Sequence, residues 1–265
     1  MKKKLSLPAR SLCGLVIGAA VTTSAAKSGL TVRQIAEPTG FSMSRVSRIM
    51  TGHGPVRPTD VAVLSMVFGW PPELRTYLCG LATQTHRTHW LYDHTDTQAA
   101  DMLALLESVS TNVTTYAPLL VPRRLRTTAY DQHIRSGAFA DIERPAAPSE
   151  PGGTYFLDTH VLTRPGIPED IRNHQLAHLL QRADDDLTLR VVPPGAHYRG
   201  IEPFRLLAVI RGEHVVHLEH HTATLLLHHH ADTATYTTFT QTLQTVALDP
   251  AATRHLIAGL LVRPT

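Results

Sequence analysis

The first 80 residues contain short apolar segments with the spacing of helices, and glycine or proline stands at the junctions between them. The first segment is rich in small and apolar residues and ends at Gly29. Thr31 and Ser42 stand where N-caps are needed for later segments. The pattern predicts five helices, over residues 14–28, 32–38, 42–50, 60–68 and 71–81. Five short helices in so few residues indicate a compact all-α domain.

The rest of the chain mixes helical and extended patterns. Helical spacing predicts helices over residues 98–116, 168–182, 233–248 and 251–261. Period-two alternation predicts strands over residues 187–192 and 205–210, and a hairpin formed by residues 214–219 and 223–228. Residues 83–97 are polar, so we expect a linker between a domain at 1–82 and a domain at 98–265. The expected fold is multidomain, with an all-α head of five short helices and an α+β C-terminal domain.

The N-terminal apolar segment also resembles a secretory signal. Lys2, Lys3 and Lys4 precede the apolar residues 12–21, and small residues follow as far as Ala26. The apolar run is too short to span a bilayer. Cleavage near Ala26 would destroy the first predicted helix, so a secreted protein is the alternative to the cytoplasmic protein, without a membrane segment, that the domain pattern favours.

The charge of the chain is unevenly distributed. Residues 1–90 carry eleven lysines and arginines against three acidic residues, which gives +8, while the whole chain is +3. The remainder is therefore −5. A basic N-terminal part joined to an acidic one is typical of a module that binds a polyanion, although a solvated basic surface would give the same count.

Residues 29–52 have the pattern of a helix-turn-helix. Gly40 permits a sharp turn, and Val46 and Ile49 are three apart, so they share the inward face of the second helix. The hydroxyls and guanidiniums of that helix then face outward, where they can enter the major groove of DNA. The alternative is a helical hairpin that binds protein. The candidate DNA-binding residues are Thr31, Arg33, Ser42, Ser44, Arg45, Ser47 and Arg48.

This segment resembles the Cro/repressor (XRE) family of helix-turn-helix regulators. The matching pieces are Gly29-Leu-Thr, Ile35-Ala, Gly40-Phe-Ser, Ser44-Arg-Val-Ser-Arg-Ile and Thr51-Gly. The resemblance implies binding to double-stranded DNA, and we expect a homodimer. The family usually pairs arginines of its first helix with a Glu where Met50 stands, and here both partners are missing, a change that can be neutral. Val32 replaces a Gln that contacts phosphate in the family, for which Arg33 could compensate.

Residues 107–257 resemble the C-terminal domain of many actinobacterial XRE regulators, a domain of unknown function. The pieces that carry the resemblance are Glu107, residues 119–130, Asp158, residues 172–180, residues 189–193 and residues 215–219. Arg123, Thr159 and His217 replace the family's Gly, Glu and Tyr. The resemblance implies a domain that senses a small-molecule effector, dimerises, or holds a small protein encoded by a neighbouring gene.

Residues 119–130 place arginines beside an aromatic ring. Such a group can hold an acidic ligand or an acidic partner surface, because Arg makes bidentate contacts with carboxylates. Alternatively, the leucines and the tyrosine pack in the core while the arginines are solvated. On the predicted hairpin, His217 and Glu219 point to one face. The candidate residues for a ligand or partner are Arg123, Arg124, Tyr130, His217 and Glu219.

Histidines crowd into the predicted hairpin and the residues after it. They are His214, His217, His220, His221, His228, His229 and His230. Their spacing matches no metal motif, so we predict no metal site and no cofactor. No catalytic motif stands out either. A DNA-binding transcriptional regulator is therefore favoured over the alternative, a regulator-like scaffold that has lost DNA binding and acts as an enzyme or a small-ligand-binding protein.

Overall fold

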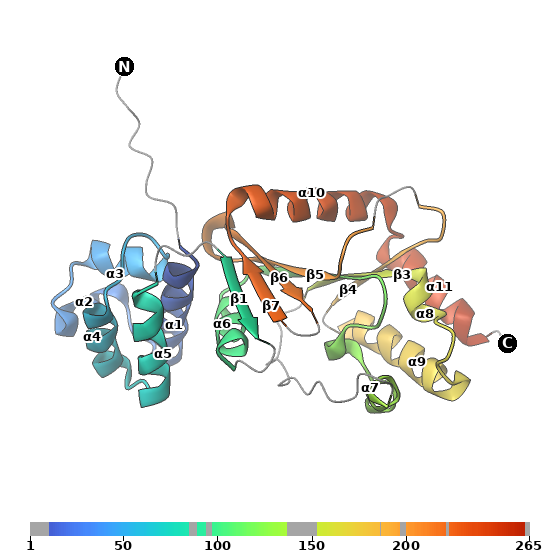
Figure 1. Ribbon diagram of the computed structural model, residues 1–265, viewed down its shortest axis with the longest axis horizontal. Helices are drawn as coiled ribbons and strands as arrows, with labels where there is room; N and C mark the ends of the chain where they lie inside the picture. The colour runs from blue at the N-terminus through green and yellow to red at the C-terminus, as the bar shows by residue number, and fades with distance from the viewer. Residues whose placement is uncertain are drawn as a thin grey trace, which may run out of the picture.

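The computed structural model describes residues 11–84, 89–93, 97–136, 153–185, 187–196, 200–220 and 223–262. It consists of a helical head, α1–α5, beside a body, β1–α11, in which helices cover a single sheet (Figure 1). This confirms the multidomain fold with an all-α head and an α+β body.

The five predicted head helices are confirmed, with small shifts at their ends. They are α1 (Leu12–Ser28), α2 (Val32–Thr39), α3 (Met43–Met50), α4 (Pro58–Phe68) and α5 (Pro72–Ala82). The N-caps Ser11, Thr31 and Ser42 each accept a hydrogen bond from a backbone N–H of the first turn. Gly29 and Gly40 end α1 and α2 in the left-handed conformation, at φ +67° and +68°, which explains why glycine stands there.

The body contains both helices and strands, and four strands follow one another in its later part. Its elements are β1 (His89–Asp93), α6 (Thr97–Ser108), β2 (Asn112–Ala117), η1 (Arg123–Leu125), α7 (Thr128–Arg135), β3 (Thr154–Asp158), α8 (Thr159–Leu162), α9 (Glu169–Asp185), β4 (Thr188–Val192), β5 (Phe204–Ala208), η2 (Ile210–Gly212), β6 (His214–Glu219), β7 (Ala223–Leu227), α10 (His230–Val246) and α11 (Pro250–Val262). The predicted hairpin is β6–β7, in which Leu218 pairs with Leu225.

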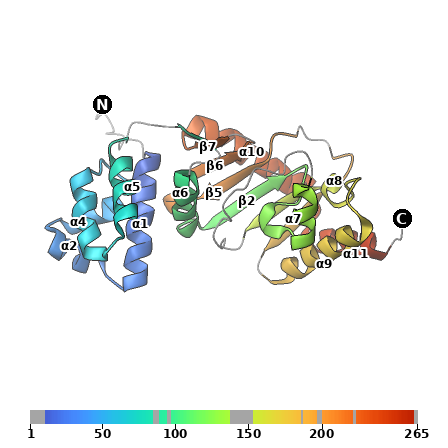
Figure 2. The same ribbon diagram turned by 60° about the horizontal axis from the view of Figure 1, so that its bottom comes forward.

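The seven strands form a mixed sheet in the order β1-β7-β6-β5-β2-β3-β4. Strand β3 is parallel to both of its neighbours, β2 and β4. All other neighbouring strands in the sheet are antiparallel. Helix α10 covers one face of the sheet, and α6, α7 and α9 lie on the other (Figures 1 and 2). The inner strands of the sheet are thus covered on both sides, as their apolar composition requires.

Two apolar clusters share the face that α6, α7 and α9 cover. One joins α6 and strands β1, β7, β6 and β5 to the head helices. The other joins α7, α9 and α11 to β3 and β4. On the opposite face, aromatic residues of the sheet pack against α10, with the rings of Phe204 and Tyr236 at 5.1 Å between centroids. The hydrophobic core therefore continues from the body into the head.

Two sequence-based expectations for the body are wrong. The segment expected to be a linker contains β1, whose Trp90 and Tyr92 are buried in the core that also contains α6. The helix expected at 98–116 ends at Ser108, and residues 112–117 form β2, because the β-branched run Val113–Thr115 favours a strand. Strand β3 was not predicted, since a strand buried on both faces shows no alternation. Prolines and glycines in residues 143–153 also predict a loop, but this segment lies almost wholly outside the described residues.

Among the described residues, no single helix combines the length and the apolar character needed to cross a bilayer. Helices α1 and α2 meet the criterion only together, and they are bent by 109° where they join.

Candidate DNA-binding and regulatory sites

Helices α2 and α3 form a helix pair whose inner face is apolar. Ile35 and Ala36 of α2 and Val46 and Ile49 of α3 are buried, as the spacing predicts. Thr31 begins α2 with a capping box, in which its backbone N–H donates to Gln34 Oε1 at 3.0 Å. The backbone of the helix-turn-helix is therefore fixed by its own caps and core.

The exposed surface of α3 begins at its N-cap. Ser42, Ser44 and Arg48 are exposed, and Ser47 is half-buried. Among the described residues, the Arg48 guanidinium makes only one long hydrogen bond, from its Nε to the Ser44 carbonyl of the same helix at 3.4 Å. These side chains are available to a partner that lies against α3.

Met43 belongs to the same surface, and the sequence analysis missed it. Its side chain is 58% exposed at the first position of α3, between Ser42 and Ser44. The sequence pattern placed only Val46 and Ile49 on the inner face and made no prediction for Met43. A large exposed apolar side chain among hydroxyls is able to contact the methyl group of thymine.

Arg45 is placed differently from the expectation that it faces DNA. Its Nη2 forms an ion pair with Asp60 Oδ2 at 2.6 Å, and its guanidinium lies 5.1 Å from the centroid of the Phe41 ring. The same Asp60 oxygen accepts the backbone N–H of Arg57 at 2.9 Å, at the start of α4. Arg45 therefore holds α3 against α4. Arg33, by contrast, pairs with Glu37 on the open surface of α2, at 3.0 Å.

Small residues on α1 explain how the head tolerates the missing ion pair near Met50. A Cβ added to Gly18 would lie 2.6 Å from the Ile49 carbonyl oxygen, so only glycine fits there. The Thr22 hydroxyl donates to the Met50 carbonyl at 3.4 Å. Close backbone contact thus holds the end of α3 against α1, in place of a charge pair.

The body contains a buried group of charges between its two apolar clusters. Glu107, at the end of α6, is 2% exposed. Its Oε2 pairs with Arg124 Nη2 of η1 at 2.8 Å, and its Oε1 pairs with Arg205 Nη2 of β5 at 2.6 Å. A carboxylate so deeply buried needs positively charged partners. If Glu107 or one of its arginines is removed, the charge that remains is less well compensated in a region of low dielectric.

Other predicted ligand residues adjoin this group. His217 stands opposite Arg205 on the neighbouring strand, and Glu219 follows on the same face of β6. Burial lowers the pKa of Arg123, and the negative charge of Glu219 acts against this shift, so Glu219 lies within electrostatic range of Arg123. We call these side chains the charged seam: Glu107, Arg123, Arg124, Arg205, His217 and Glu219.

Tyr130 is separate from the seam. It is buried in the cluster of α7 and α9, and burial raises the pKa of its hydroxyl. Four of the five predicted ligand residues therefore come together, and Tyr130 serves the core instead.

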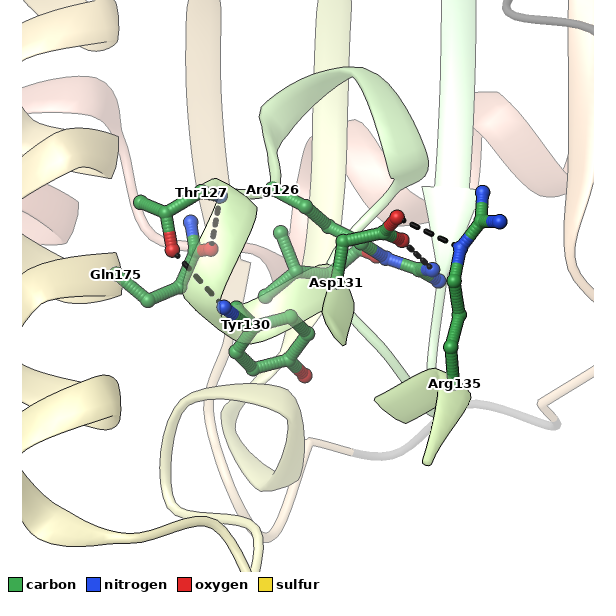
Figure 3. Close-up of polar contacts among 7 residues, drawn as sticks. Arg126, Thr127, Tyr130, Asp131, Arg135 and Gln175 are labelled. Carbon is green, nitrogen blue, oxygen red and sulfur yellow. Dashed lines mark hydrogen bonds and ion pairs between the residues drawn. The ribbon is translucent and has the colours of Figure 1, made fainter. Parts of the chain in front are cut away.

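Gln175 of α9 holds the turn that follows η1, the segment that carries Arg123 and Arg124 of the seam. The sequence pattern does not predict this role. The Gln175 Oε1 accepts the Thr127 backbone N–H at 2.7 Å, and its Nε2 donates to the Leu125 carbonyl at 2.6 Å. Figure 3 shows this amide against the start of α7, with Tyr130 below it. A buried amide that satisfies both backbone groups holds the turn between η1 and α7 in one conformation.

Asp131 ties the other side of the same turn. Its carboxylate accepts from Arg126 Nη1 at 3.0 Å and from Arg135 Nε at 2.8 Å (Figure 3). Burial opposes ionisation, but the hydrogen bonds and charges of these two arginines outweigh it and lower the pKa of Asp131. Asp131 is therefore ionised near neutral pH.

The histidines of the hairpin do not form a shared cluster in the part of the chain that the structure describes, where no three metal-binding side chains meet. His228 lies 3.7 Å from Glu213, and His229 caps α10. His221 lies outside the described residues.

Comparisons with known proteins agree with this division of the chain. A model of a helix-turn-helix domain matches residues 17–78, and a model of a domain of unknown function, DUF5753, matches residues 100–259. These matches confirm the resemblance to an XRE-type helix-turn-helix protein with a C-terminal domain of unknown function. No curated protein matches the chain significantly.

One similar solved structure is that of TrmBL2, an archaeal chromatin protein described as showing a novel mode of DNA binding. It is 12% identical, with a TM-score of 0.32, over 83% of this chain and 88% of that chain. A likeness this weak supports no conclusion about the present protein.

Proposed function

We propose that this chain, which belongs to the family defined by the domain of unknown function DUF5753 and has a helix-turn-helix domain ahead of it, is a transcriptional regulator whose α3 enters the major groove of double-stranded DNA. The observation that carries the proposal is the exposed surface of α3, formed by Ser42, Met43, Ser44 and Arg48 on an intact helix pair. It acts in the cytoplasm, where the DNA lies.

Each side chain of that surface has a defined use. Arg48 is suited to the O6 and N7 acceptors of guanine, the serines to either kind of base edge, and Met43 to a thymine methyl group. Thr31 and Arg33, at the start of α2, are suited to phosphate contacts, which set the register of α3 on the duplex. Arg45 contributes by orienting α3 through Asp60.

A matched pair of arginine variants tests this function. Arg48→Ala removes a guanidinium from the α3 surface, and Arg75→Ala removes an equally exposed one from α5. Bound DNA is selected from a random library with the wild-type chain, and both variants are then titrated on the best sequence. Arg48→Ala is expected to lose about 1–3 kcal/mol of binding and to relax the preference at one position, while Arg75→Ala binds as wild type. Equal binding by all three proteins would remove α3 from this role.

The charged seam supports a second function, regulation by an acidic ligand or by an acidic surface of a small partner protein. Three arginines and a histidine meet two glutamates there, so the seam carries an excess of positive charge. Arg makes charge-assisted, often bidentate bonds with carboxylates and phosphates, and these are strong where water is excluded.

Arg123 is the residue that tests the regulatory role. It is half-buried and interacts with Glu219, whereas Arg124 is already committed to Glu107. Calorimetry with the small protein encoded by a neighbouring gene, or with a pool of acidic metabolites, is expected to give binding that Arg123→Gln abolishes with little change in melting temperature. Arg164→Gln, outside the seam, is the control. Equal binding by Arg123→Gln and the wild type would contradict the regulatory role of the charged seam.

Binding as a homodimer completes the proposal. Helix-turn-helix proteins of this kind commonly read two half-sites one helical turn apart. Sedimentation of the protein with and without DNA tests it, and a single protomer on the selected DNA would contradict it.

A further inference from the structure

Helix α1 lies between the recognition helix α3 and helix α6 of the body. It contacts both, and its residues 12–21 are buried. Figure 2 shows α1 beside α6. A helix buried on nearly all sides cannot move without its neighbours, because close-packed interiors transmit small displacements. The geometry of α1 therefore links the head to the body.

The contact between α1 and α3 leaves no room for sliding. Gly14 and Gly18 bring the backbone of α1 against the carbonyls of Gly52 and Ile49, where an added Cβ would lie at 2.9 and 2.6 Å. Thr22 adds its bond to Met50. Backbone in contact with backbone makes α1 and the end of α3 one rigid unit.

The contact between α1 and α6 combines a polar pair with apolar packing. Thr23 Oγ1 and Ser108 Oγ lie 2.8 Å apart. Leu105, three residues earlier on the same side of α6, is half-buried against the cluster that spans head and body. A further bond joins α5 to α6, from the Tyr77 hydroxyl to the Gln98 carbonyl at 3.3 Å.

The end of α6 belongs to both contacts at once. Ser108 reaches α1, and the preceding Glu107 carries the ion pairs with Arg124 and Arg205 in the charged seam. A change in the ion pairs of Glu107 would shift the last turn of α6, and α6 packs against α1. An acidic ligand that draws Arg124 or Arg205 away from Glu107 would make such a change.

We infer that α1 transmits the state of the seam to α3, so that breaking the Glu107 ion pairs alters the affinity of the head for DNA. This inference rests on the proposed DNA-binding role of α3 and specifies how the seam regulates it. Coupling between two sites by a shared element typically changes affinity by about fivefold or more.

The test uses the full chain and two matched carboxylate-to-amide variants. Glu107→Gln breaks the seam pairs that involve α6. Glu202→Gln is the control, because it removes a carboxylate that accepts the Tyr236 hydroxyl of α10, on the opposite face of the sheet. DNA affinity and hydrogen exchange of the amides in α1 and α3 are measured for each. Glu107→Gln is expected to change the affinity by about fivefold or more and to speed exchange in α1 and α3. Glu202→Gln should leave both at the wild-type values.

A second variant checks the route. Leu105→Lys opens the contact between α6 and α1, so Glu107→Gln added to Leu105→Lys should no longer change the affinity or the exchange of α3. If Glu107→Gln fails to fold, the double variant Thr23→Ala, Ser108→Ala takes its place, and faster exchange in α3 is again expected.

Two outcomes separate the possible failures. Faster exchange confined to α6 and η1, with α3 and the DNA affinity unchanged, would overturn the coupling. A wild-type chain that binds no DNA would overturn the proposed function, and the exchange of α3 in Glu107→Gln would still decide whether the seam and α3 are coupled.

Discussion

Arg45 and Asp60 join α3 to α4 by an ion pair of 2.6 Å, and the same carboxylate oxygen caps the start of α4. Asp60 is 7% exposed, while the arginine reaches it from the surface. Arg45, which the sequence pattern predicts to face DNA, thus orients α3 instead, the helix proposed to read DNA.

Arg45→Ala is expected to lower the free energy of unfolding by about 1–2 kcal/mol, because it leaves a buried carboxylate with one partner fewer. Urea unfolding of Arg45→Ala, Asp60→Asn and the double variant measures the coupling between them. Arg48→Ala, on the open face of α3, serves as the control and should unfold as wild type. An Arg45→Ala protein with unchanged stability but no DNA binding would make Arg45 a base-reading residue after all.

Met43→Ala is expected to weaken the preference for thymine at one position of the selected DNA, with affinity for other sequences nearly unchanged. The physical reason is the loss of apolar contact with the thymine methyl group. Titration on paired duplexes with thymine or uracil at that position provides the measurement. A wild-type protein that binds both duplexes equally would exclude the contact.

The affinity for DNA is expected to fall steeply with salt, because residues 1–90 carry a charge of +8. Each phosphate contact adds about −0.9 to the slope of log affinity against log salt concentration. Arg33→Ala should make the slope less steep by about one contact, and Arg75→Ala should not. A flat dependence for the wild type would contradict a DNA-binding head.

Gln175→Leu is expected to destabilise the body by about 2–4 kcal/mol, since it leaves the Thr127 N–H and the Leu125 carbonyl buried without this partner. Thermal unfolding measures the loss. Gln132→Leu, at an exposed position of α7, provides the matched control. A Gln175→Leu protein as stable as the wild type would show that other groups satisfy the turn.

The pH dependence of stability is expected to report Asp131. Its pKa is lowered in the folded chain, so its ionised form stabilises the fold above the unfolded pKa, about 3.8, and the stabilisation disappears as pH falls through the folded value. The difference in unfolding free energy between wild type and Asp131→Asn should have its full size at pH 7 and should shrink as the pH falls below about 4. A difference that is the same at pH 7 and pH 3 would mean that the ion pairs contribute nothing.

The sequence by itself determined the local elements of the head. Glycines at left-handed positions, capping residues and apolar spacing fix α1 to α5, because each depends on residues within a few positions of one another. The pairing of Val46 with Ile49 on an inner face follows from helix geometry alone. The β6–β7 hairpin is equally local, since its strands are neighbours in the chain.

Only the tertiary structure decided which charges meet. Glu107, Arg124 and Arg205 come from α6, η1 and β5, and the order of the strands in the sheet brings them together. The same holds for Arg45, which local spacing turns outward and Asp60 of another helix draws back. Periodicity records which face of an element is buried, whereas a partner distant in the chain is chosen by packing and by the cost of leaving a buried charge alone.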